Sequence, residues 1–240
     1  MASRFNSGID YFIQSQAPSF FLFIRDYVLN REAWTVLNLI SEQTKVYVFS
    51  GIIRNFFLGY PEVRDFDIVV SRNRISIPKE YISSIHVEKN SFGGRKYLIG
   101  NLKIDFWFLQ DTWGIREEKK KANVNALINS AFFNFSAVAY DFNNRKFVYS
   151  EDFRKFLSLK VLDVVYEKNP NLPLCIVNTL YYSKQYELPL GTKLAMWIVE
   201  HYQPEFDYGP VQEQHWGKVA FGNEAIEDFY FQCVWELIHQ

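Results

Sequence analysis

The sequence predicts an α+β fold: a mixed sheet of four to five strands with helices on one face, followed by a mainly helical C-terminal part. Three observations support this prediction. Residues 46–70 have the pattern of a strand, a Ser-Gly turn, a short helix and a second strand. Further strand-like segments extend to residue 109, and the chain after Glu151 has helical periodicity. We therefore expect two domains, residues 1–150 and residues 151–240.

The elements follow in order from local patterns. Residues 8–42 carry apolar side chains at roughly helical spacing, which predicts two short helices. The predicted elements after them are a strand at 46–49, a helix at 52–58 that ends at Gly59, strands at 65–70, 84–88, 96–99 and 102–109, and a strand-like pair at 132–140 and 146–149. The Gly93-Gly94 pair supplies a turn between two of these strands.

Length and composition indicate a folded, globular chain and limit the classes of partner that it can bind. The 240 residues are 48% hydrophobic, enough for one sizeable core or two small ones. The formal net charge of −1 means that any RNA contact must come from a local basic patch, and nothing indicates DNA.

Cys175 and Cys233 form no CxxC pair, so the sequence gives no sign of a structural zinc site. The sequence shows neither a signal peptide nor a run of about 18 apolar residues. We expect a cytoplasmic protein without membrane association.

The Ser50-Gly51 turn is a candidate anion site. It lies where a strand ends and a helix begins, and helix N-termini present free N–H groups and a positive dipole end to anions. Gly51 allows close backbone approach, and Ser50 offers a hydroxyl. Arg54, one turn into the helix, is placed either to bind a phosphate or to hold Asp65 or Asp67. The alternative is a tight turn without a ligand.

Three aspartates form a candidate metal site. Asp65 and Asp67 are two apart on a predicted strand, so their side chains share a face. Paired carboxylates repel unless a cation lies between them, and a hard cation such as Mg²⁺ or Mn²⁺ prefers oxygen ligands. Asp105 is the lone polar residue in an apolar strand and offers a third carboxylate. The alternative is a solvated strand end in which Asp65 pairs with Arg64 or Arg72.

The segment 46–70 resembles a known family pattern. Its residues, in order, are Ser50-Gly51, Arg54-Asn55, Phe57-Leu58-Gly59 and Asp65-Phe66-Asp67. They resemble the head domain of the poly(A) polymerases and CCA-adding tRNA nucleotidyltransferases, in the DNA polymerase β-like nucleotidyltransferase superfamily. That pattern is a strand, Gly-Gly, two residues, Arg-Asp, Leu-Leu-Gly, and then Asp-x-Asp on the next strand. The resemblance is good over residues 44–109 and faint from there to about residue 190.

The resemblance implies a metal-dependent transfer of an NMP from an NTP, such as ATP, to a hydroxyl acceptor, with release of pyrophosphate. The implied acceptor is an RNA 3′ end, most simply that of tRNA. Residues 1–150 would be the head domain and residues 151–240 the helical neck. The implied catalytic and metal-binding residues are Asp65, Asp67 and Asp105, with Mg²⁺ or Mn²⁺ as cofactor. The implied nucleotide-binding residues are Ser50, Gly51 and Arg54.

The sequence departs from the family after residue 109. Ala131-Phe132 stand where the family has Arg-Asp, and Cys175 and Asn178 stand where two neck arginines face the nucleotide. Other cations are available to compensate: Arg95, Lys96, Lys155 and Lys160. Three alternatives therefore remain open: nucleotidylation of a protein or small molecule, as in toxin-antitoxin and defence systems; a catalytically inactive nucleotide sensor or interaction module; and, more remotely, a metal-dependent nuclease.

Overall fold

The computed structural model describes residues 2–60, 62, 66–72, 74–81, 84–89, 94–99 and 102–239. The chain divides into two compact units, one of Met1–Ala131 with Phe135–Ser158 and one of Phe132–Asn134 with Leu159–Gln240. The first unit holds the sheet, and the second is mainly helical. Within the described ranges, no helix combines the length and the apolar character that crossing a bilayer requires.

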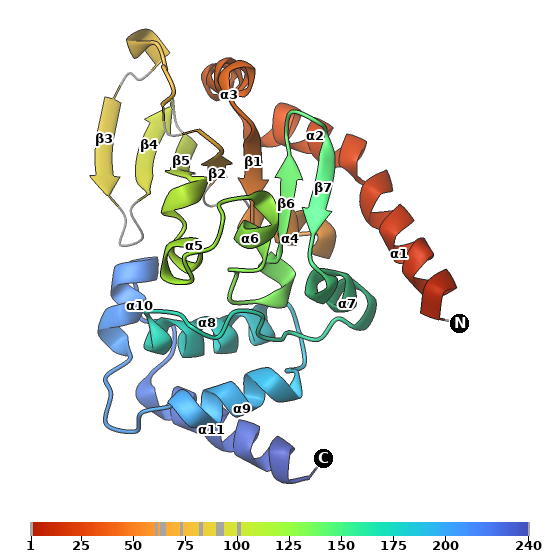
Figure 1. Cartoon of the computed structure of the whole chain (residues 1–240). Coiled ribbons are helices and arrows are strands. Elements are labelled where there is room, and N and C mark those ends of the chain that lie inside the picture. The colour runs from red at the N-terminus through yellow and green to blue at the C-terminus, as the bar shows by residue number, and fades with distance from the viewer. Residues whose placement is uncertain are drawn as a thin grey trace. The chain divides into compact units, whose positions relative to one another are not determined.

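The strands of the first unit form one mixed sheet (Figure 1). They are β1 (Val46–Phe49), β2 (Phe66–Val70), β3 (Ser84–Lys89), β4 (Arg95–Ile99), β5 (Leu102–Phe108), β6 (Val138–Asp141) and β7 (Lys146–Tyr149). Their order is β3-β4-β5-β2-β1-β6-β7, and among these described strands only β2 and β5 pair in parallel. The predicted fold class is confirmed. The described sheet has seven strands, more than the four to five predicted, because the β6–β7 hairpin pairs with β1.

Helices from the N-terminal part of the chain cover one face of this sheet. They are α1 (Ala2–Ser15), α2 (Ala17–Phe23), a π-helical turn (Ile24–Val28), α3 (Arg31–Gln43) and α4 (Gly51–Leu58). The ring of Phe20 in α2 lies 4.9 Å from that of Tyr140 and 5.3 Å from that of Phe147, both on the β6–β7 hairpin. The sequence predicted two helices before β1. The structure has an additional helix start at Ala17, where a proline in the first turn favours a new helix.

A second, smaller helical layer covers part of the opposite face. Helices α5 (Trp113–Glu117) and α6 (Val124–Ile128) contribute Ile115 and Leu127 to a buried cluster with Tyr47, Val69 and Ala139 of the sheet. The sequence predicted helices on one face only. Because the central strands β1 and β2 carry apolar side chains on both faces, the second face also needs a cover.

Local signals set the ends of the helices that flank β1. The Asn30 side chain accepts a hydrogen bond from Ala33 N at 2.8 Å and thereby caps α3. Gly59 ends α4 in the left-handed conformation with φ of 77°, and Tyr60 N donates to Asn55 O at 2.9 Å. The helix predicted at 52–58 is therefore confirmed, together with its stop at Gly59.

Helix α7 (Glu151–Leu159) follows β7, and four helices form most of the second unit: α8 (Leu172–Gln185), α9 (Thr192–His201), α10 (Gly209–Trp216) and α11 (Asn223–Ile238). Residues 132–134 also belong to this unit. Asn134 N donates to Asp163 O at 2.9 Å, and the Phe132 ring lies 4.8 Å from that of Trp197. The strand predicted at 132–140 is therefore shorter and begins at Val138.

Candidate active site

Two of the three predicted metal ligands lie side by side in the sheet. Strands β2 and β5 are parallel neighbours, and their register makes Asp67 and Asp105 direct partners. Partners on adjacent strands, about 5 Å apart, point to the same face, so the two carboxylates share one face. Lys96 on β4 is the partner of Asp105 on its other side, and Lys96 Nζ lies 3.8 Å from Asp105 Oδ2. Two carboxylates and a cation thus form a row across three strands.

Strand alternation explains why this row points away from the N-terminal helices. The residues that flank the two aspartates are at most 5% exposed and fill the opposite face: Phe66, Ile68, Ile104 and Phe106. The side chain of Asp105 is itself only 15% exposed. Two neighbouring carboxylates repel each other unless positive charge is near. Lys96 supplies positive charge beside Asp105, and a bound cation would add to it.

Asp65, the third predicted ligand, lies outside the described residues, and its place in the site stays a prediction. Within the described ranges, no three or more His, Cys, Asp or Glu side chains gather into a group that could hold a metal ion. The described pair offers carboxylate oxygens, which are the donors that Mg²⁺ and Mn²⁺ prefer. Asp67 and Asp105 therefore fit two positions in the coordination of such an ion.

Ser50 connects β1 to α4 in a conformation that L-residues seldom adopt, with φ of 60° and ψ of −112°. Its carbonyl oxygen accepts hydrogen bonds from Ile53 N at 3.0 Å and Arg54 N at 3.1 Å, which begins the helix. A Cβ added at Gly51 would meet one described atom within 4 Å, Arg54 Nη2 at 3.7 Å. With glycine at this position, no side chain stands between the backbone of the turn and the Arg54 guanidinium.

Contacts with Phe135 and Asn55 help to hold Arg54 beside the turn. Its guanidinium carbon lies 5.0 Å from the centre of the Phe135 ring, and its Nε donates to Asn55 Oδ1 at 3.0 Å. Asn55 is fixed in turn, because its Nδ2 donates to Glu62 O at 2.6 Å. The asparagine that replaces the family's aspartate therefore orients the arginine without neutralising it. A fixed guanidinium at a helix N-terminus suits phosphate binding.

The turn and the carboxylate row lie at the same end of the sheet. Val48 of β1 pairs with Ile68 of β2, so β1 ends at Phe49 alongside the part of β2 that carries Asp67. Adjacent strands are about 4.8 Å apart. The structure therefore brings Ser50 and Gly51 near Asp67, as nucleotide and metal binding in one site require.

Sequence reasoning did not assign two residues of this site. Lys96 was named only as one of several cations, although counting the β4–β5 hairpin register would have placed it opposite Asp105. Phe135, which is completely buried and lies under Arg54, is 81 residues further along the chain (135 minus 54). No local pattern indicates so distant a contact.

The positions where the sequence departs from the family are packing positions in this structure. Ala131, Phe132 and Cys175 are at most 8% exposed. Burial raises the pKa of the Cys175 thiol, which keeps it neutral. Asn178 Oδ1 is buried without a hydrogen-bond partner among the described residues. None of these side chains replaces the positive charge of the family's arginines.

No family model matches the sequence, and no curated protein does. Solved structures do match. A tRNA nucleotidyltransferase in complex with a primer tRNA and an incoming ATP analogue is 22% identical with a TM-score of 0.53, over 67% of this chain and 47% of that chain. The Thermotoga maritima CCA-adding enzyme with tRNA is 16% identical with a TM-score of 0.55, over 75% and 44%. A CCA-adding enzyme with CTP is 17% identical with a TM-score of 0.54, over 76% and 45%.

These comparisons confirm the predicted resemblance at the level of the fold. The matched region is less than half of each of those solved chains. The chain therefore has the fold found in the corresponding part of these nucleotidyltransferases.

Proposed function

We propose that this protein is a metal-dependent nucleotidyltransferase that transfers an NMP from an NTP to a hydroxyl of an RNA 3′ end. The observation that carries the proposal is the register pairing of Asp67 with Asp105 beside the Ser50-Gly51 turn. In the transfer, the acceptor oxygen forms a bond to the α-phosphorus, the bond to the bridging oxygen breaks, and pyrophosphate leaves. The acceptor hydroxyl loses its proton to water.

Asp67 and Asp105, with Asp65 as a third ligand, would hold Mg²⁺ or Mn²⁺. The bound ion would supply positive charge to the phosphates and lower the pKa of the acceptor hydroxyl. Lys96 Nζ lies 3.8 Å from Asp105 Oδ2 and places positive charge beside this carboxylate.

The turn after β1 would hold the triphosphate. The first N–H groups of α4 and the guanidinium of Arg54 would be the donors, and the lack of a side chain at Gly51 would let the phosphate oxygens come close. Phe135 and Asn55 hold the guanidinium in place, so little side-chain entropy is lost when a phosphate binds. This arrangement would position the α-phosphate near the carboxylate row.

An RNA acceptor is supported by the solved structures that share the fold, because two of them are complexes with tRNA. The formal net charge of −1 gives this chain no general attraction for RNA. We therefore expect the acceptor to bind weakly and with strong dependence on a local basic patch. A small hydroxyl acceptor would give the same chemistry with the same carboxylates.

A second candidate function is nucleotide binding without transfer. Buried, uncharged residues at Ala131, Phe132 and Cys175 favour it, because the family's cations are missing there. The paired carboxylates weigh against it, since a sensor gains nothing from two adjacent negative charges.

A labelling experiment separates the two functions. Each of the four NTPs, labelled at the α-phosphate, is incubated with the protein, Mg²⁺ and total RNA, with an EDTA control. We expect one or more nucleotides to label RNA in the Mg²⁺ samples alone. Label in no acceptor, together with nucleotide-dependent thermal stabilisation, would instead establish binding without transfer. Neither label nor stabilisation would overturn both functions.

A further inference from the structure

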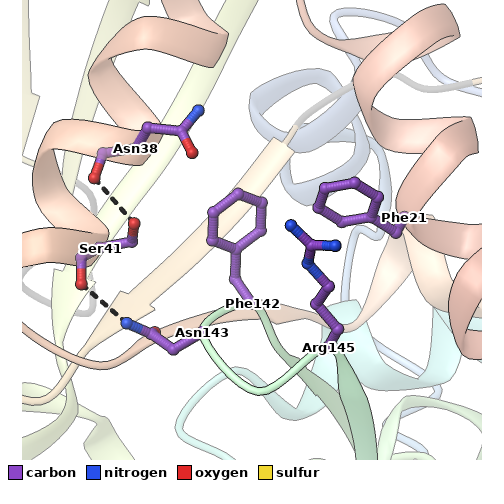
Figure 2. Close-up of a pocket in the computed structure, with 6 residues that line it drawn as sticks. All are labelled: Phe21, Asn38, Ser41, Phe142, Asn143 and Arg145. Carbon is purple, nitrogen blue, oxygen red and sulfur yellow. Dashed lines mark hydrogen bonds between the residues drawn. The ribbon is translucent and has the colours of Figure 1, made fainter.

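A pocket of about 200 Å³ lies in the first unit at the other end of β1 (Figure 2). Three segments line it: α2, α3 and the β6–β7 turn. The lining residues are Phe21, Asn38, Ser41, Phe142, Asn143 and Arg145. Asn143 binds the backbone where β1 begins, whereas Ser50 follows the strand's last residue. This pocket is therefore separate from the candidate active site.

Hydrogen bonds fix the polar wall of the pocket. Asn143 Nδ2 donates to Ser41 O at 2.7 Å, and Asn143 Oδ1 accepts from Val46 N at 2.8 Å. Ser41 Oγ donates to Asn38 O at 2.7 Å. These contacts link the β6–β7 turn to α3 and to the first residue of β1. The wall is therefore formed before any ligand arrives.

Aromatic rings form the opposite wall. Phe21 lies 6.0 Å from Phe142, and both rings pack on Trp34, at 5.6 and 5.7 Å respectively. Phe142 is only 5% exposed. The ring of Phe21 is thus held in place and can support a side chain stacked on it.

Arg145 provides that stacked side chain. Its guanidinium carbon lies 4.2 Å from the centre of the Phe21 ring, and Figure 2 shows the group between Phe21 and Phe142. In the described part of the chain, the guanidinium forms no ion pair or hydrogen bond. The carboxylate in the same turn, Asp141, accepts instead from the backbone and side-chain N–H groups of Asn144, at 2.9 and 2.8 Å.

We propose that this pocket binds a phosphate group through Arg145. The described lining holds one cation and no carboxylate, and its volume suits a single compact polar group. A guanidinium presents a planar fork of N–H donors that matches a phosphate. Stacking on Phe21 orders this fork in advance, which lowers the entropic cost of binding. The phosphate comes either from the free anion or from the backbone of an RNA.

The test is an NMR titration of the full-length, ¹⁵N-labelled protein with inorganic phosphate and, separately, with a short oligouridylate. The signals to follow are Arg145 Nε and the backbone amides of Asn143 and Arg145. The variant is Arg145→Gln, which removes the charge, and the control is Lys146→Gln. Lys146 is exposed, is next in sequence and does not line the pocket, so both variants lose the same charge.

We expect phosphate to shift these signals in the wild type. The affinity for phosphate should fall by roughly tenfold or more in Arg145→Gln and change by about twofold or less in Lys146→Gln. Tighter binding of oligouridylate through the same signals would identify RNA as the source. A response to inorganic phosphate alone would identify the free anion. Unchanged wild-type signals with both probes, or equal phosphate binding by Arg145→Gln, would overturn the proposal.

Discussion

Ser50 carries the backbone strain of the candidate active site. Its φ of 60° and ψ of −112° suit glycine, and the family that this segment resembles has glycine at this position. A residue held in such a sparsely populated region costs about 1 to 3 kcal/mol. Strand β1 on one side and helix α4 on the other hold the conformation in place. The strained serine keeps a hydroxyl at the turn where the triphosphate is proposed to bind.

Replacing Ser50 separates the strain from the hydroxyl. We expect Ser50→Gly to raise the free energy of unfolding by about 1 kcal/mol, because glycine adopts this conformation without a Cβ clash. Ser50→Ala should give no such gain, since alanine removes the hydroxyl and keeps the clash. Urea unfolding of the three proteins measures the difference. A Ser50→Gly protein less stable than the alanine variant would show that the turn is not strained.

Arg54 should matter more for nucleotide binding than for folding. Its contacts with the Phe135 ring and Asn55 are a cation–π interaction and a side-chain hydrogen bond, and we expect Arg54→Ala to cost about 1 kcal/mol in stability. Nucleotide affinity should fall by roughly tenfold or more with the loss of a charged donor. Thermal melting and NTP titration measure the two effects.

Arg154 supplies the matched control for Arg54. Its Nη1 lies 3.0 Å from Asp10 Oδ2, its Nη2 pairs with Glu151, and its side chain is only 20% exposed. Arg154→Ala should therefore lower stability and leave nucleotide affinity unchanged. If Arg54→Ala unfolds the protein instead, Arg54 is a structural clamp.

At the scale of elements, two tyrosines tie the N-terminal helices to the β6–β7 hairpin. The Tyr140 hydroxyl donates to Ala17 O at 3.4 Å, and the Tyr149 hydroxyl donates to Asp10 Oδ1 at 2.8 Å. Burial raises the pKa of each hydroxyl to about 12, and the nearby Asp10 contributes at Tyr149. In an unfolded chain a tyrosine ionises near pH 10, at about its ordinary pKa. The unfolded state therefore releases these protons first as the pH rises.

The contribution of these two hydroxyls to stability should consequently be constant below about pH 10 and decline between about pH 10 and 12, as the neutral hydroxyls are lost. The stability of the Tyr149→Phe variant should decline less steeply over this pH range, because phenylalanine does not ionise. Tyr11→Phe is the control, since Tyr11 is 78% exposed and should leave the decline unchanged. Urea unfolding at a series of pH values measures the free energy of unfolding of each protein. An equal decline of that free energy in Tyr149→Phe and wild type would show that the Tyr149 hydroxyl does not cause the loss of stability.

The start of α9 depends on a close contact in the second unit. Asp163 Oδ1 accepts from Val164 N and Leu194 N, both at 2.9 Å, and a Cβ at Gly191 would lie 2.5 Å from the Asp163 carboxylate carbon. Gly191→Ala should therefore destabilise the protein by about 2 kcal/mol or more, because the carboxylate cannot move without losing both hydrogen bonds.

Gly222 is the matched control for Gly191. It also precedes a helix, α11, with an extended backbone, but a Cβ there would meet no described atom within 4 Å. Gly222→Ala should cost only about 1 kcal/mol or less, because the change replaces glycine by the poorer N-cap residue alanine without a steric clash. Thermal melting compares the two variants. Equal melting temperatures of the two variants would show that a Cβ at Gly191 causes no steric clash with Asp163.

For the molecule as a whole, the sequence predicts the parts of the fold that depend on local chemistry. Alternation along β2 and β5 correctly places Asp67 and Asp105 opposite the buried residues. Their side-by-side register could not be predicted, because pairing between strands that are distant in sequence depends on the whole sheet. The Arg54–Phe135 contact and the strain at Ser50 are likewise results of three-dimensional packing.

The central claim is that the Asp67–Asp105 pair is the centre of a metal-dependent nucleotidyl transfer. The most direct measurement is pyrophosphate release from NTP, with Mg²⁺ and RNA, by wild type, Asp67→Asn, Asp105→Asn and Lys96→Gln, each checked for folding by thermal melting. We predict that either asparagine variant loses activity by roughly a hundredfold or more, because it weakens metal binding, whereas Lys96→Gln loses about tenfold or less. Folded asparagine variants that release pyrophosphate at the wild-type rate would contradict the claim.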